Sequence, residues 1–421
     1  MDQSIKERLA LLQKGDIPQG YRKTKAGIMP IDWDDTIRAK DVFRNYTDKK
    51  HNGELEILAS TQENGIVPRS QIGIDIQCSD EGIAGYKKVS QGDFVISLRS
   101  FQGGIEYSQY EGIVSPAYTV LKPIKSISDG YYQNYFKTSG FIQRLNSAVY
   151  GIRDGKQIGY QDFGNLYIHY PPVEEQKKIA QILAHCDKVI ELKQRLIEEE
   201  KKKNQWLLEF AYKLSGAQYT KISLKNCGKW FSGGTPDKRN NDYWNHGTIK
   251  WVSSQEVKGT HIQDTTYKIT HKAIAESTTT IAPAYSLLLV TRSGILKHSI
   301  PVAYISEDMA INQDIKALIP KEGIDYYYLL SYLKYKEKEL VSTYVKTGTT
   351  VESIIMNLFL KLEVPFPSYE EQIRISNVIR CNDKKLQALA EEVECWKEKK
   401  KALMQFLLTG TVRVKPNEEQ R

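Results

Sequence analysis

The chain has 421 residues, of which 40% are hydrophobic and 26% charged, a composition typical of a soluble protein with two or three domains. Its longest apolar run, residues 281–290, is far shorter than the roughly 20 residues that a membrane-spanning helix needs. The N-terminus is charged and lacks the apolar core of a signal peptide. The five cysteines show no metal-ligand spacing. We therefore expect a cytoplasmic protein with reduced thiols, no membrane segment and no metal site.

The net charge is +8, and the distribution of the basic residues along the chain indicates where an acidic partner would bind. Residues 174–213 carry nine Lys/Arg and eight Asp/Glu, so the basic excess lies mainly outside this segment. Residues 229–241 instead mix basic side chains with aromatic and amide side chains. Basic side chains neutralise phosphates, and Arg, Asn, Gln and aromatics contact bases, so this mixture favours a nucleic acid as partner. The simpler alternative is an ordinary, slightly basic protein.

The predicted elements fall into six segments along the chain. Residues 1–33 form a helical or extended N-terminal segment, and residues 34–170 a first mixed module, with a strand at 93–98 and a helix at 130–145. Residues 171–216 form a long helix. Residues 217–364 form a second module, with strands at 249–252 and 286–291 and a helix at 326–338. A second long helix at 365–410 and a tail at 411–421 follow. We expect most of the tyrosines to pack in the cores.

The two halves of the chain repeat each other. Glu174-Glu175-Gln176 returns 196 residues later as Glu370-Glu371-Gln372, and Asp187-Lys188 returns at the same interval as Asp383-Lys384. Each copy opens a long charged helix, and weaker matches continue upstream through both modules. A period this long exceeds the 20–50 residues of solenoid repeats. It indicates a duplicated unit of one module and one helix, and therefore two similar working ends.

Both long segments carry apolar residues at alternating spacings of four and three, the heptad pattern of a coiled-coil helix. Each spans about 40 residues, roughly 60 Å at ~1.5 Å per residue. Ser368 and Glu371 form a capping box at the start of the second helix. A helix of this kind needs a partner for its apolar stripe, and the nearest candidate is its own copy.

Full antiparallel overlap of the two helices predicts a register in which the numbers of facing residues add up to 586. Asn204 then faces Asn382, and Ile379 faces Leu207. A buried asparagine pair would fix this register, because an asparagine that faces an apolar side chain has no hydrogen-bond partner. The alternative is that these helix ends are splayed or covered by another protein, which would leave both asparagines in solvent.

The sequence contains little that indicates catalysis. Residues 151–156 are one residue too short for a Walker A phosphate loop, and no G-x-G-x-x-G follows a strand. Tyr170-Pro171-Pro172 differs from the Asn/Asp-Pro-Pro-aromatic loop of amino-methyltransferases. Pro236-Asp237-Lys238 resembles part of a nuclease core but lacks the acidic-x-Lys strand that completes it. The seven histidines form no metal-binding pattern. We therefore expect no catalytic residue, no metal ligand and no cofactor bound by this chain.

The motifs together resemble those of a known family, the specificity subunits of type I restriction–modification enzymes. The resemblance rests on the duplicated Glu-Glu-Gln segments and on Ser232-Gly233-Gly234-Thr235-Pro236, Thr291-Arg292-Ser293-Gly294-Ile295, Asn312-Gln313-Asp314 and Leu407-Leu408-Thr409-Gly410. These motifs span almost the whole chain in the family's order. The first module departs from the pattern, because Asn45-Tyr46-Thr47-Asp48 stands where Ser232-Gly233-Gly234-Thr235 would be. It looks like a different recognition class.

The resemblance implies an α/β (α+β) fold: two target-recognition domains with mixed sheets, joined by two long helices in an antiparallel coiled coil with a pseudo-two-fold repeat. Each domain would read half of a bipartite double-stranded DNA target, with half-sites about one helical turn, ~34 Å, apart. The helices would set the gap and dock two methyltransferase subunits, which bind S-adenosylmethionine and methylate adenine. Two restriction (motor–nuclease) subunits can join them. The chain itself would be a non-catalytic reader and scaffold.

We expect the DNA contacts to come from polar residues just beyond strand ends. The candidates are Thr235, Lys238, Arg239, Arg292, Lys297, Asn312 and Gln313 in the second module and Arg44, Arg69 and Arg99 in the first. Arg99 and Arg292 occupy matching positions of the repeat, and an equal alternative is that both brace a loop. For Gly233 and Gly234 a tight turn is the simpler interpretation.

Two other classes of function remain open. An autonomous DNA-modifying enzyme would need a cofactor or metal site, which the sequence does not show. A coiled-coil scaffold, or a stand-alone DNA-binding protein without restriction–modification partners, would explain the helices. A scaffold that does not bind DNA would leave the basic modules unexplained.

Overall fold

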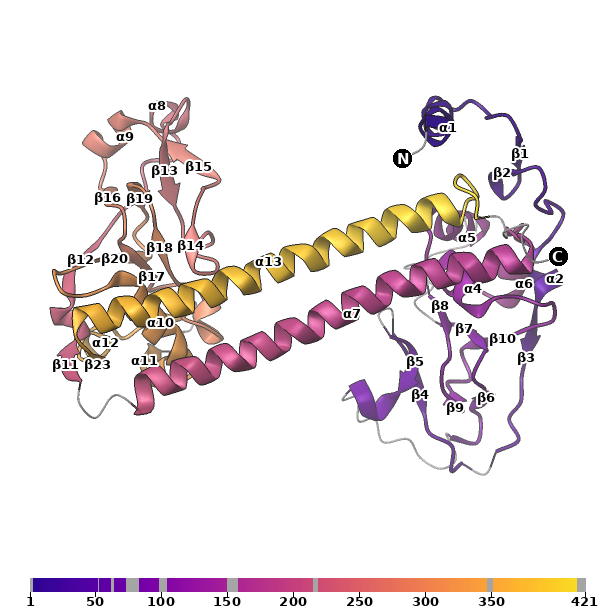
Figure 1. The fold of residues 1–421 in the computed structure, drawn as a ribbon, viewed down its shortest axis with the longest axis horizontal. Coiled ribbons are helices and arrows are strands. Elements are labelled where there is room, and N and C mark those ends of the chain that lie inside the picture. The colour runs from indigo at the N-terminus through magenta and orange to yellow at the C-terminus, as the bar shows by residue number, and fades with distance from the viewer. Residues whose placement is uncertain are drawn as a thin grey trace. The chain divides into compact units, whose positions relative to one another are not determined.

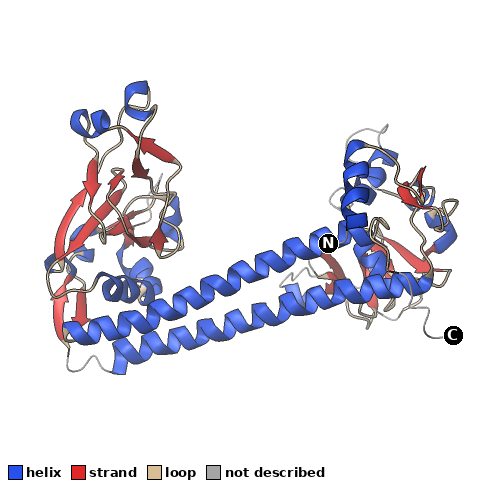
Figure 2. Ribbon diagram, turned by 45° about the horizontal axis from the view of Figure 1, so that its top comes forward, coloured by secondary structure: helices blue, strands red, loops and turns tan. Residues whose placement is uncertain are grey.

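The computed structural model describes residues 3–51, 53–61, 64–72, 83–97, 104–149, 158–214, 219–346 and 351–414. The chain forms two compact units. Unit 1 combines Met1–Lys193 with Glu392–Arg421, and unit 2 is Gln194–Glu391. Each unit contains one α/β module and a stretch of both long helices (Figures 1 and 2). None of the helices in the described part of the chain has the length and apolarity that crossing a bilayer requires.

Unit 1 contains small antiparallel sheets and short helices. Its elements are α1 (Gln3–Lys14), β1 (Tyr21–Thr24), β2 (Gly27–Pro30), α2 (Ala39–Val42), β3 (Phe43–Tyr46), β4 (Leu58–Thr61), β5 (Gly65–Pro68), η1 (Arg69–Ile72), β6 (Lys87–Val89), β7 (Phe94–Ile96), β8 (Ile105–Tyr107), β9 (Gly112–Val114), β10 (Thr119–Pro123), α4 (Asp129–Tyr135), α5 (Ser139–Val149) and α6 (Tyr160–Gly164). The largest sheet has the strand order β3-β10-β7-β8, and β1-β2, β4-β5 and β6-β9 form pairs.

Unit 2 has two larger mixed sheets. Its elements are β11 (Thr220–Ser223), η5 (Leu224–Asn226), β12 (Gly228–Ser232), α8 (Asn241–Trp244), β13 (Ile249–Val252), β14 (His261–Ile262), β15 (Tyr267–Ile269), α9 (His271–Glu276), β16 (Thr280–Ala282), β17 (Leu287–Val290), η6 (Gly294–Lys297), β18 (Val302–Ile305), β19 (Met309–Ile311), β20 (Ile315–Pro320), α10 (Tyr326–Tyr335), α11 (Glu337–Tyr344), β21 (Val345–Lys346), β22 (Ser353–Ile354), α12 (Met356–Phe359) and β23 (Glu363–Phe366). The sheets have the orders β12-β20-β17-β18-β14 and β15-β13-β19-β16, with parallel pairing only at β14–β18 and β13–β19.

Aromatic side chains fill the core of unit 1, as expected for the tyrosines. Tyr131, Tyr132 and Tyr135 on α4 are all buried. The ring of Phe43 on β3 packs edge-on against Tyr132, with centroids 5.1 Å apart, and edge-on against Phe94 on β7 at 5.5 Å. In unit 2 the tyrosines of α10 occupy the equivalent core. Edge-to-face packing of this kind stabilises a core beyond simple burial.

The predicted strands and helices mostly coincide with observed elements. β7, β13 and β17 lie within or match the ranges 93–98, 249–252 and 286–291. The helices expected at 130–145 and 326–338 are wrong in extent, because each range holds parts of two helices. In unit 2 the break falls at Lys336, whose ψ of 0° leaves the helical region and separates α10 from α11. No proline or glycine marks this break in the sequence.

The long helices are α7 (Val173–Glu209), followed by a π-helical turn η3 (Phe210–Leu214), and α13 (Tyr369–Leu407). They run antiparallel in both units. In unit 1 the ammonium of Lys400 lies 2.6 Å from the Asp187 carboxylate. In unit 2 the ammonium of Lys385 lies 2.6 Å from the carboxylate of Glu200. The numbers of these pairs add up to 587 and 585, so the register predicted around 586 is confirmed.

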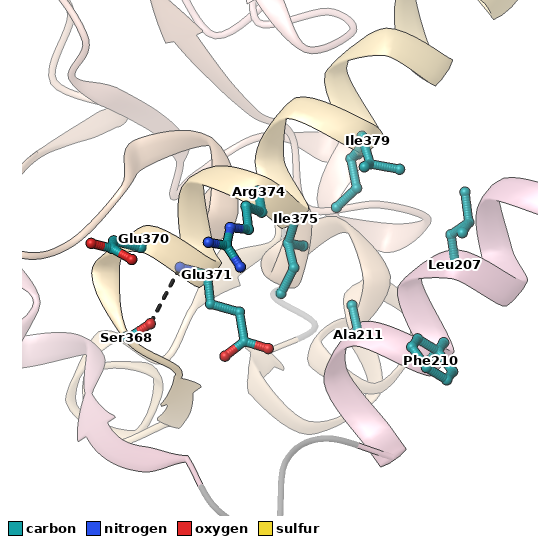
Figure 3. A pocket seen from close by; sticks show the side chains of 10 residues that line it. Leu207, Phe210, Ala211, Ser368, Glu370, Glu371, Arg374, Ile375 and Ile379 are labelled. Atoms are coloured by element: carbon teal, nitrogen blue, oxygen red, sulfur yellow. Dashed lines mark hydrogen bonds between the residues drawn. The ribbon is translucent and has the colours of Figure 1, made fainter.

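The apolar residues of the seam follow the same register in unit 2. Figure 3 shows Ile375 and Ile379 of α13 on one side of a pocket and Ala211 and Leu207 of α7 on the other. The capping bond at the start of α13 is also present, because the Glu371 backbone N–H donates to the Ser368 hydroxyl at 3.3 Å. The residues at this end of the seam therefore lie as the heptad pattern predicts.

The predicted hydrogen-bonded asparagine pair is wrong. The amide nitrogen of Asn204 donates to Asp383 at 3.4 Å. The carbonyl oxygen of Asn204 and the amide nitrogen of Asn382 are both buried without a hydrogen-bond partner. A carboxylate is a stronger acceptor than an amide oxygen, so Asp383 captures the donor that the pair would have used. The register thus rests on the apolar stripe and the cross-helix ion pairs.

The duplicated Glu-Glu-Gln motif ties each helix to its own module through its glutamine. Gln176 and Gln372 are buried, at 0% and 2% exposure. The side-chain oxygen of Gln176 accepts from the Ser128 backbone N–H at 3.0 Å, and that of Gln372 accepts from Asp325 at 3.0 Å. Both bonds fix the residue that precedes a short module helix, α4 or α10. The same interaction is therefore built twice.

A second duplicated contact connects these helices to the segment just before each long helix. The Tyr132 hydroxyl donates to the backbone carbonyl of His169 at 3.0 Å, and the Tyr328 hydroxyl donates to that of Pro365 at 2.8 Å. Donor and acceptor are both 196 residues apart between the copies. Each buried hydroxyl is thereby satisfied. The repeat seen in the sequence is a repeat of internal contacts.

Unit 1 also gathers both ends of the described chain around Glu175. The guanidinium of Arg413 binds the Asp32 carboxylate at 2.7 and 2.8 Å and the Glu175 carboxylate at 2.8 and 2.9 Å. The indole of Trp33 donates to the same Glu175 at 3.0 Å. Glu175 is 1% exposed. Its buried charge is therefore compensated by a bidentate arginine and an indole.

His169 forms a second buried contact between distant segments of unit 1. Its Nδ1 lies 2.9 Å from the Leu408 carbonyl at the end of α13, and its Nε2 lies 3.1 Å from the Ala26 carbonyl. Burial lowers the pKa of the imidazole to about 4. His169 is therefore neutral at pH 7 and donates to one of the two carbonyls.

Candidate nucleic-acid interface

Three loops of unit 2 come together where the two sheets meet. They follow β12, β17 and β19 and contain the candidates Thr235, Arg292, Asn312 and Gln313. The backbone N–H of Gly234 donates to Ile311 at 3.0 Å, and that of Thr291 donates to Asp314 at 2.8 Å. These bonds hold the loops after β12 and β17 against the loop after β19. The structure therefore joins four of the candidates that the sequence placed beyond strand ends.

Thr235 and Gln313 are in direct contact. The Thr235 hydroxyl donates to the side-chain oxygen of Gln313 at 2.6 Å. Gln313 is exposed. A hydroxyl can accept as well as donate, so the same contact holds if the amide is turned over. Thr235 thus keeps in place a glutamine whose amide can pair with an adenine edge.

The two glycines of this loop allow close packing and do not make a tight turn, which corrects the expectation. A Cβ on Gly233 would collide with the backbone carbonyl of Ile311, and a Cβ on Gly234 would collide with Thr278. Neither glycine has a positive φ. The glycines are therefore needed because the backbone of the loop packs directly against the end of β19 and the segment before β16.

Arg292 and Lys297 are both exposed. Neither side chain makes an ion pair with a carboxylate in the described part of the chain. The loop around Arg292 is braced by its backbone, since Arg292 pairs with Ser353 as an isolated bridge and Ser293 N–H donates to Glu352 at 3.1 Å. Among the described residues, this brace is made by backbone groups. A DNA contact by Arg292 stays a prediction.

Lys238 and Arg239 lie on the exposed loop that leads to α8. The side chain of Arg239 is 91% exposed, and its guanidinium contacts the Asp237 carboxylate at 3.3 Å. The Arg239 backbone N–H also donates to Asp237, at 3.0 Å. Such an exposed pair is weak, so solvent or a phosphate can compete for the guanidinium. Lys238 makes no ion pair with a described carboxylate.

Asn312 has a structural role that the sequence did not predict. It is 5% exposed, and its side-chain oxygen accepts from the Asp314 backbone N–H at 3.1 Å. This bond forms an Asx turn that shapes the loop carrying Gln313. The side chain available at the surface is therefore that of Gln313, and a direct DNA contact by Asn312 stays a prediction.

The structure describes two of the three candidates of the first module, Arg44 and Arg69. Arg44 is exposed on β3, with its guanidinium 5.9 Å from the ring of Tyr46. Arg69 begins η1 and contacts the Tyr86 hydroxyl at 3.5 Å. Arg99 lies outside the described residues.

Sequence analysis missed a cation–aromatic cluster on β3 and β10. The ammonium of Lys122 lies 4.3 Å from the ring of Tyr46, and Lys122 is the cross-strand partner of Arg44. Tyr46 thus lies near two cations. The two strands are far apart in the sequence, so only the register of the sheet reveals the cluster.

The comparisons with known proteins agree with this architecture. Residues 30–201 and 218–394 each match the family described as "Type I restriction modification DNA specificity domain". The chain is 34% identical over 157 residues to the EcoR124I/EcoR124II specificity subunit of Escherichia coli, an alignment that covers 37% of this chain and only 39% of that protein. It is 22% identical over 434 residues to the putative MjaX specificity subunit of Methanocaldococcus jannaschii, covering 94% and 97% of the two chains.

Solved structures show the same fold. A chain from a study of complex assembly and conformational transition of the type I R-M system has a TM-score of 0.57 at 15% identity, over 94% of this chain and 100% of that one. The type I restriction–modification S subunit from M. genitalium has a TM-score of 0.55 at 14% identity, over 88% and 95%. Two α/β modules on a pair of long antiparallel helices define the class of fold. The chain belongs to the type I restriction–modification DNA specificity family.

Proposed function

We propose that this chain reads a bipartite double-stranded DNA target, one half with each module, and scaffolds two methyltransferase subunits. The observation that carries the proposal is the exact duplication of the contacts between module and helix. Gln176 and Gln372 each bind their own module in the same way, 196 residues apart. A molecule built twice from the same parts suits a target with two parts.

The helices act as the spacer in this proposal. The seam has a single register, supported by ion pairs such as Lys400–Asp187 and Lys385–Glu200. Each buried glutamine fastens a module to its helix. A fixed register together with fixed attachments would keep the gap between the half-sites constant.

The exposed side chains of the second module supply the contacts. Arg292 and Lys297 are suited to phosphates, and Gln313 is suited to a base edge. Loss of a phosphate contact weakens binding to all sequences and flattens its salt dependence. Loss of a base contact costs about 1–3 kcal/mol and relaxes specificity at one position. Arg292→Ala and Gln313→Ala should therefore have different signatures.

Catalysis belongs to the partners in this proposal. The methyltransferase subunits bind S-adenosylmethionine and methylate adenine, and two restriction subunits can join to cleave unmodified DNA. The specificity chain binds no cofactor of its own and works in the cytoplasm.

The proposal is tested by purifying the chain with its methyltransferase subunit and mapping the methylated adenines. We expect a split target, and exchange of residues 34–165 for those of another family member should change only one half. If both halves change together, the two-reader mechanism is wrong. If the chain alone transfers methyl groups, it is an autonomous enzyme. If it binds DNA but no methyltransferase, or binds no DNA, the alternatives of a stand-alone binder or a scaffold hold.

A further inference from the structure

Each unit has a groove between its module and its long helix, and the two grooves occupy repeat-related positions. Groove 1, about 680 Å³, is lined on α7 by Ala184, Asp187, Lys188 and Glu191. Groove 2, about 620 Å³, is lined on α13 by Arg380, Asp383, Lys384 and Gln387. Each α13 position lies 196 residues after its α7 counterpart. The same helix face therefore opens onto a groove in both units, and the linings can be compared directly.

The charges of groove 1 are neutralised within unit 1. The ammonium of Lys188 lies 3.2 Å from the Glu191 carboxylate. The Asp187 carboxylate binds Lys400. Lys137, which also lines the groove, forms an ion pair with Glu106, with its ammonium 3.2 Å from the carboxylate. The lysines of groove 1 thus have carboxylate partners in the structure.

Groove 2 has three cations without such partners. Lys258, Arg380 and Lys384 make no ion pair with a carboxylate in the described part of the chain. The acidic residue that lines the groove, Asp383, accepts hydrogen bonds from the Tyr327 hydroxyl at 2.7 Å and from Asn204. The cations of groove 2 are therefore left to bind an anion from outside the chain.

Arg380 is held in place by aromatic rings. Its guanidinium carbon lies 4.5 Å from the ring centroid of Tyr327 and 5.5 Å from that of Tyr326. Its Nε is buried without a hydrogen-bond partner. Stacking on a ring orients a guanidinium without neutralising its charge. One Nη of Arg380 also donates to the Tyr326 hydroxyl at 3.4 Å. The other Nη N–H groups can therefore donate to a ligand with little loss of side-chain entropy.

The opposite wall of groove 2 is also fixed. The ammonium of Lys334 donates to the backbone carbonyl of Gly259 at 2.8 Å and to the Thr260 hydroxyl at 2.9 Å. The ring of His261 on β14 stacks on Tyr304 of β18, with centroids 4.4 Å apart and planes 4° apart. A wall that is already ordered costs little to bind against.

We propose that groove 2 binds phosphates of the DNA backbone next to the half-site read by the unit 2 module, whereas groove 1 does not. This inference rests on the proposed function. Three cations spread over module and helix suit successive phosphates of one strand better than a single small anion. A protein partner is less suitable, because three cations line the groove and Leu386 is the one aliphatic side chain of the lining, whereas protein interfaces depend on buried apolar anchors. The two ends of the molecule would then contact DNA unequally.

The test measures binding of the full chain, purified with its methyltransferase subunit, to a random-sequence 30-bp duplex across a range of NaCl concentrations. The variant is Lys258→Gln/Lys384→Gln, since both lysines are exposed and loss of either leaves the core intact. Loss of two phosphate contacts should make the slope of log K against log salt shallower by about 1.8. If binding is equal at 1 M salt, affinity at 0.1 M then falls roughly 60-fold. The matched control is Lys188→Gln, at the position of groove 1 equivalent to Lys384, and its slope should stay unchanged.

Four outcomes would overturn the inference. An unchanged slope in the double variant removes groove 2 from the DNA contact. An equal change in Lys188→Gln shows a general charge effect and no difference between the grooves. An unchanged slope with loss of the methyltransferase subunit assigns groove 2 to a protein partner. Absence of salt-dependent DNA binding in the wild-type complex contradicts the proposed function itself, and only this outcome does so.

Discussion

The starts of α7 and α13 have the same Glu-Glu-Gln sequence but different surroundings. Gln176 and Gln372 make equivalent bonds to their modules. Glu175 is buried against Arg413 and Trp33, whereas its counterpart Glu371 is exposed and accepts a hydrogen bond from the Tyr219 hydroxyl at 3.4 Å. One residue of the motif therefore has the same role in both copies, and the other has a role in unit 1 alone.

The difference shows that a duplicated motif can carry duplicated and single functions together. The glutamine binds the module, and the module is present in both halves of the chain. The glutamate acts on the N-terminal segment and the C-terminal tail, which exist once and lie in unit 1. The following substitutions test this comparison.

Arg413→Ala should have the largest effect. It removes four contacts to Asp32 and Glu175 and leaves the Glu175 charge buried with only the Trp33 indole and a backbone N–H. Loss of one partner of a buried ion pair costs about 3–5 kcal/mol. We expect a loss of that size in the free energy of unfolding from urea denaturation. The control Glu371→Gln should change it by less than about 0.5 kcal/mol, because Glu371 is exposed. Equal effects would show that the two glutamates are equivalent.

His169 should make unit 1 sensitive to acid. Burial lowers the pKa of His169 to about 4, so protonation favours the unfolded chain, whose histidine titrates near 6.5. Its contribution is complete above pH 6.5 and is lost as the pH falls towards 4. Between pH 7.5 and 4.5 wild type should lose about 2–3 kcal/mol more than His169→Gln in urea unfolding. His185→Gln, at an exposed position, should behave as wild type, and a similar pH profile for His169→Gln would exclude this role.

Gln176→Met and Gln372→Met should have similar effects. Each keeps the side-chain volume but leaves a backbone N–H, that of Ser128 or Asp325, without its partner. An unpaired buried donor costs about 1–3 kcal/mol. Thermal unfolding of the two variants should show matching losses of stability. A loss in one variant only would mean that the duplicated bonds are not energetically equivalent.

Asn382→Leu should have the smallest effect and should stabilise the protein. The amide nitrogen of Asn382 is buried without a partner, and replacing an unsatisfied donor by an apolar group gains about 1 kcal/mol. Asn204→Leu should instead destabilise by a similar amount, because it removes the bond to Asp383. Denaturation midpoints of the two variants should shift in opposite directions. Equal losses in both would indicate that the asparagines bind each other in solution.

The seam was predictable because it depends on local periodicity and on the repeat. A heptad pattern and a 196-residue offset suffice to place Ile379 against Leu207. The choice of Asp383 as the partner of Asn204 was not predictable, because it depends on side-chain positions within the seam. The same applies to Gly233 and Gly234, whose close contacts come from a segment of another sheet.

The candidate DNA residues show the same limit. The sequence placed Arg292, Thr235 and Gln313 beyond strand ends, and the structure joins their loops. The sequence could not show that Asn312 is buried while its neighbour Gln313 is exposed, because both are polar residues of the same loop. It also could not single out Arg380, which looks like any charged residue of a coiled-coil helix. Its stacking on Tyr327 depends on the packing of α10 against α13.

The division of the chain has a consequence for biosynthesis. Unit 2 is one continuous stretch, residues 194–391, whereas unit 1 needs residues from both sides of it. During translation, unit 1 would therefore stay incompletely folded until unit 2 has been synthesised. Glu175 would lack Arg413, and His169 would lack the Leu408 carbonyl, until the last turns of α13 and the tail emerge. A stop codon after residue 391 would therefore leave the first-made half unfinished and the second half whole.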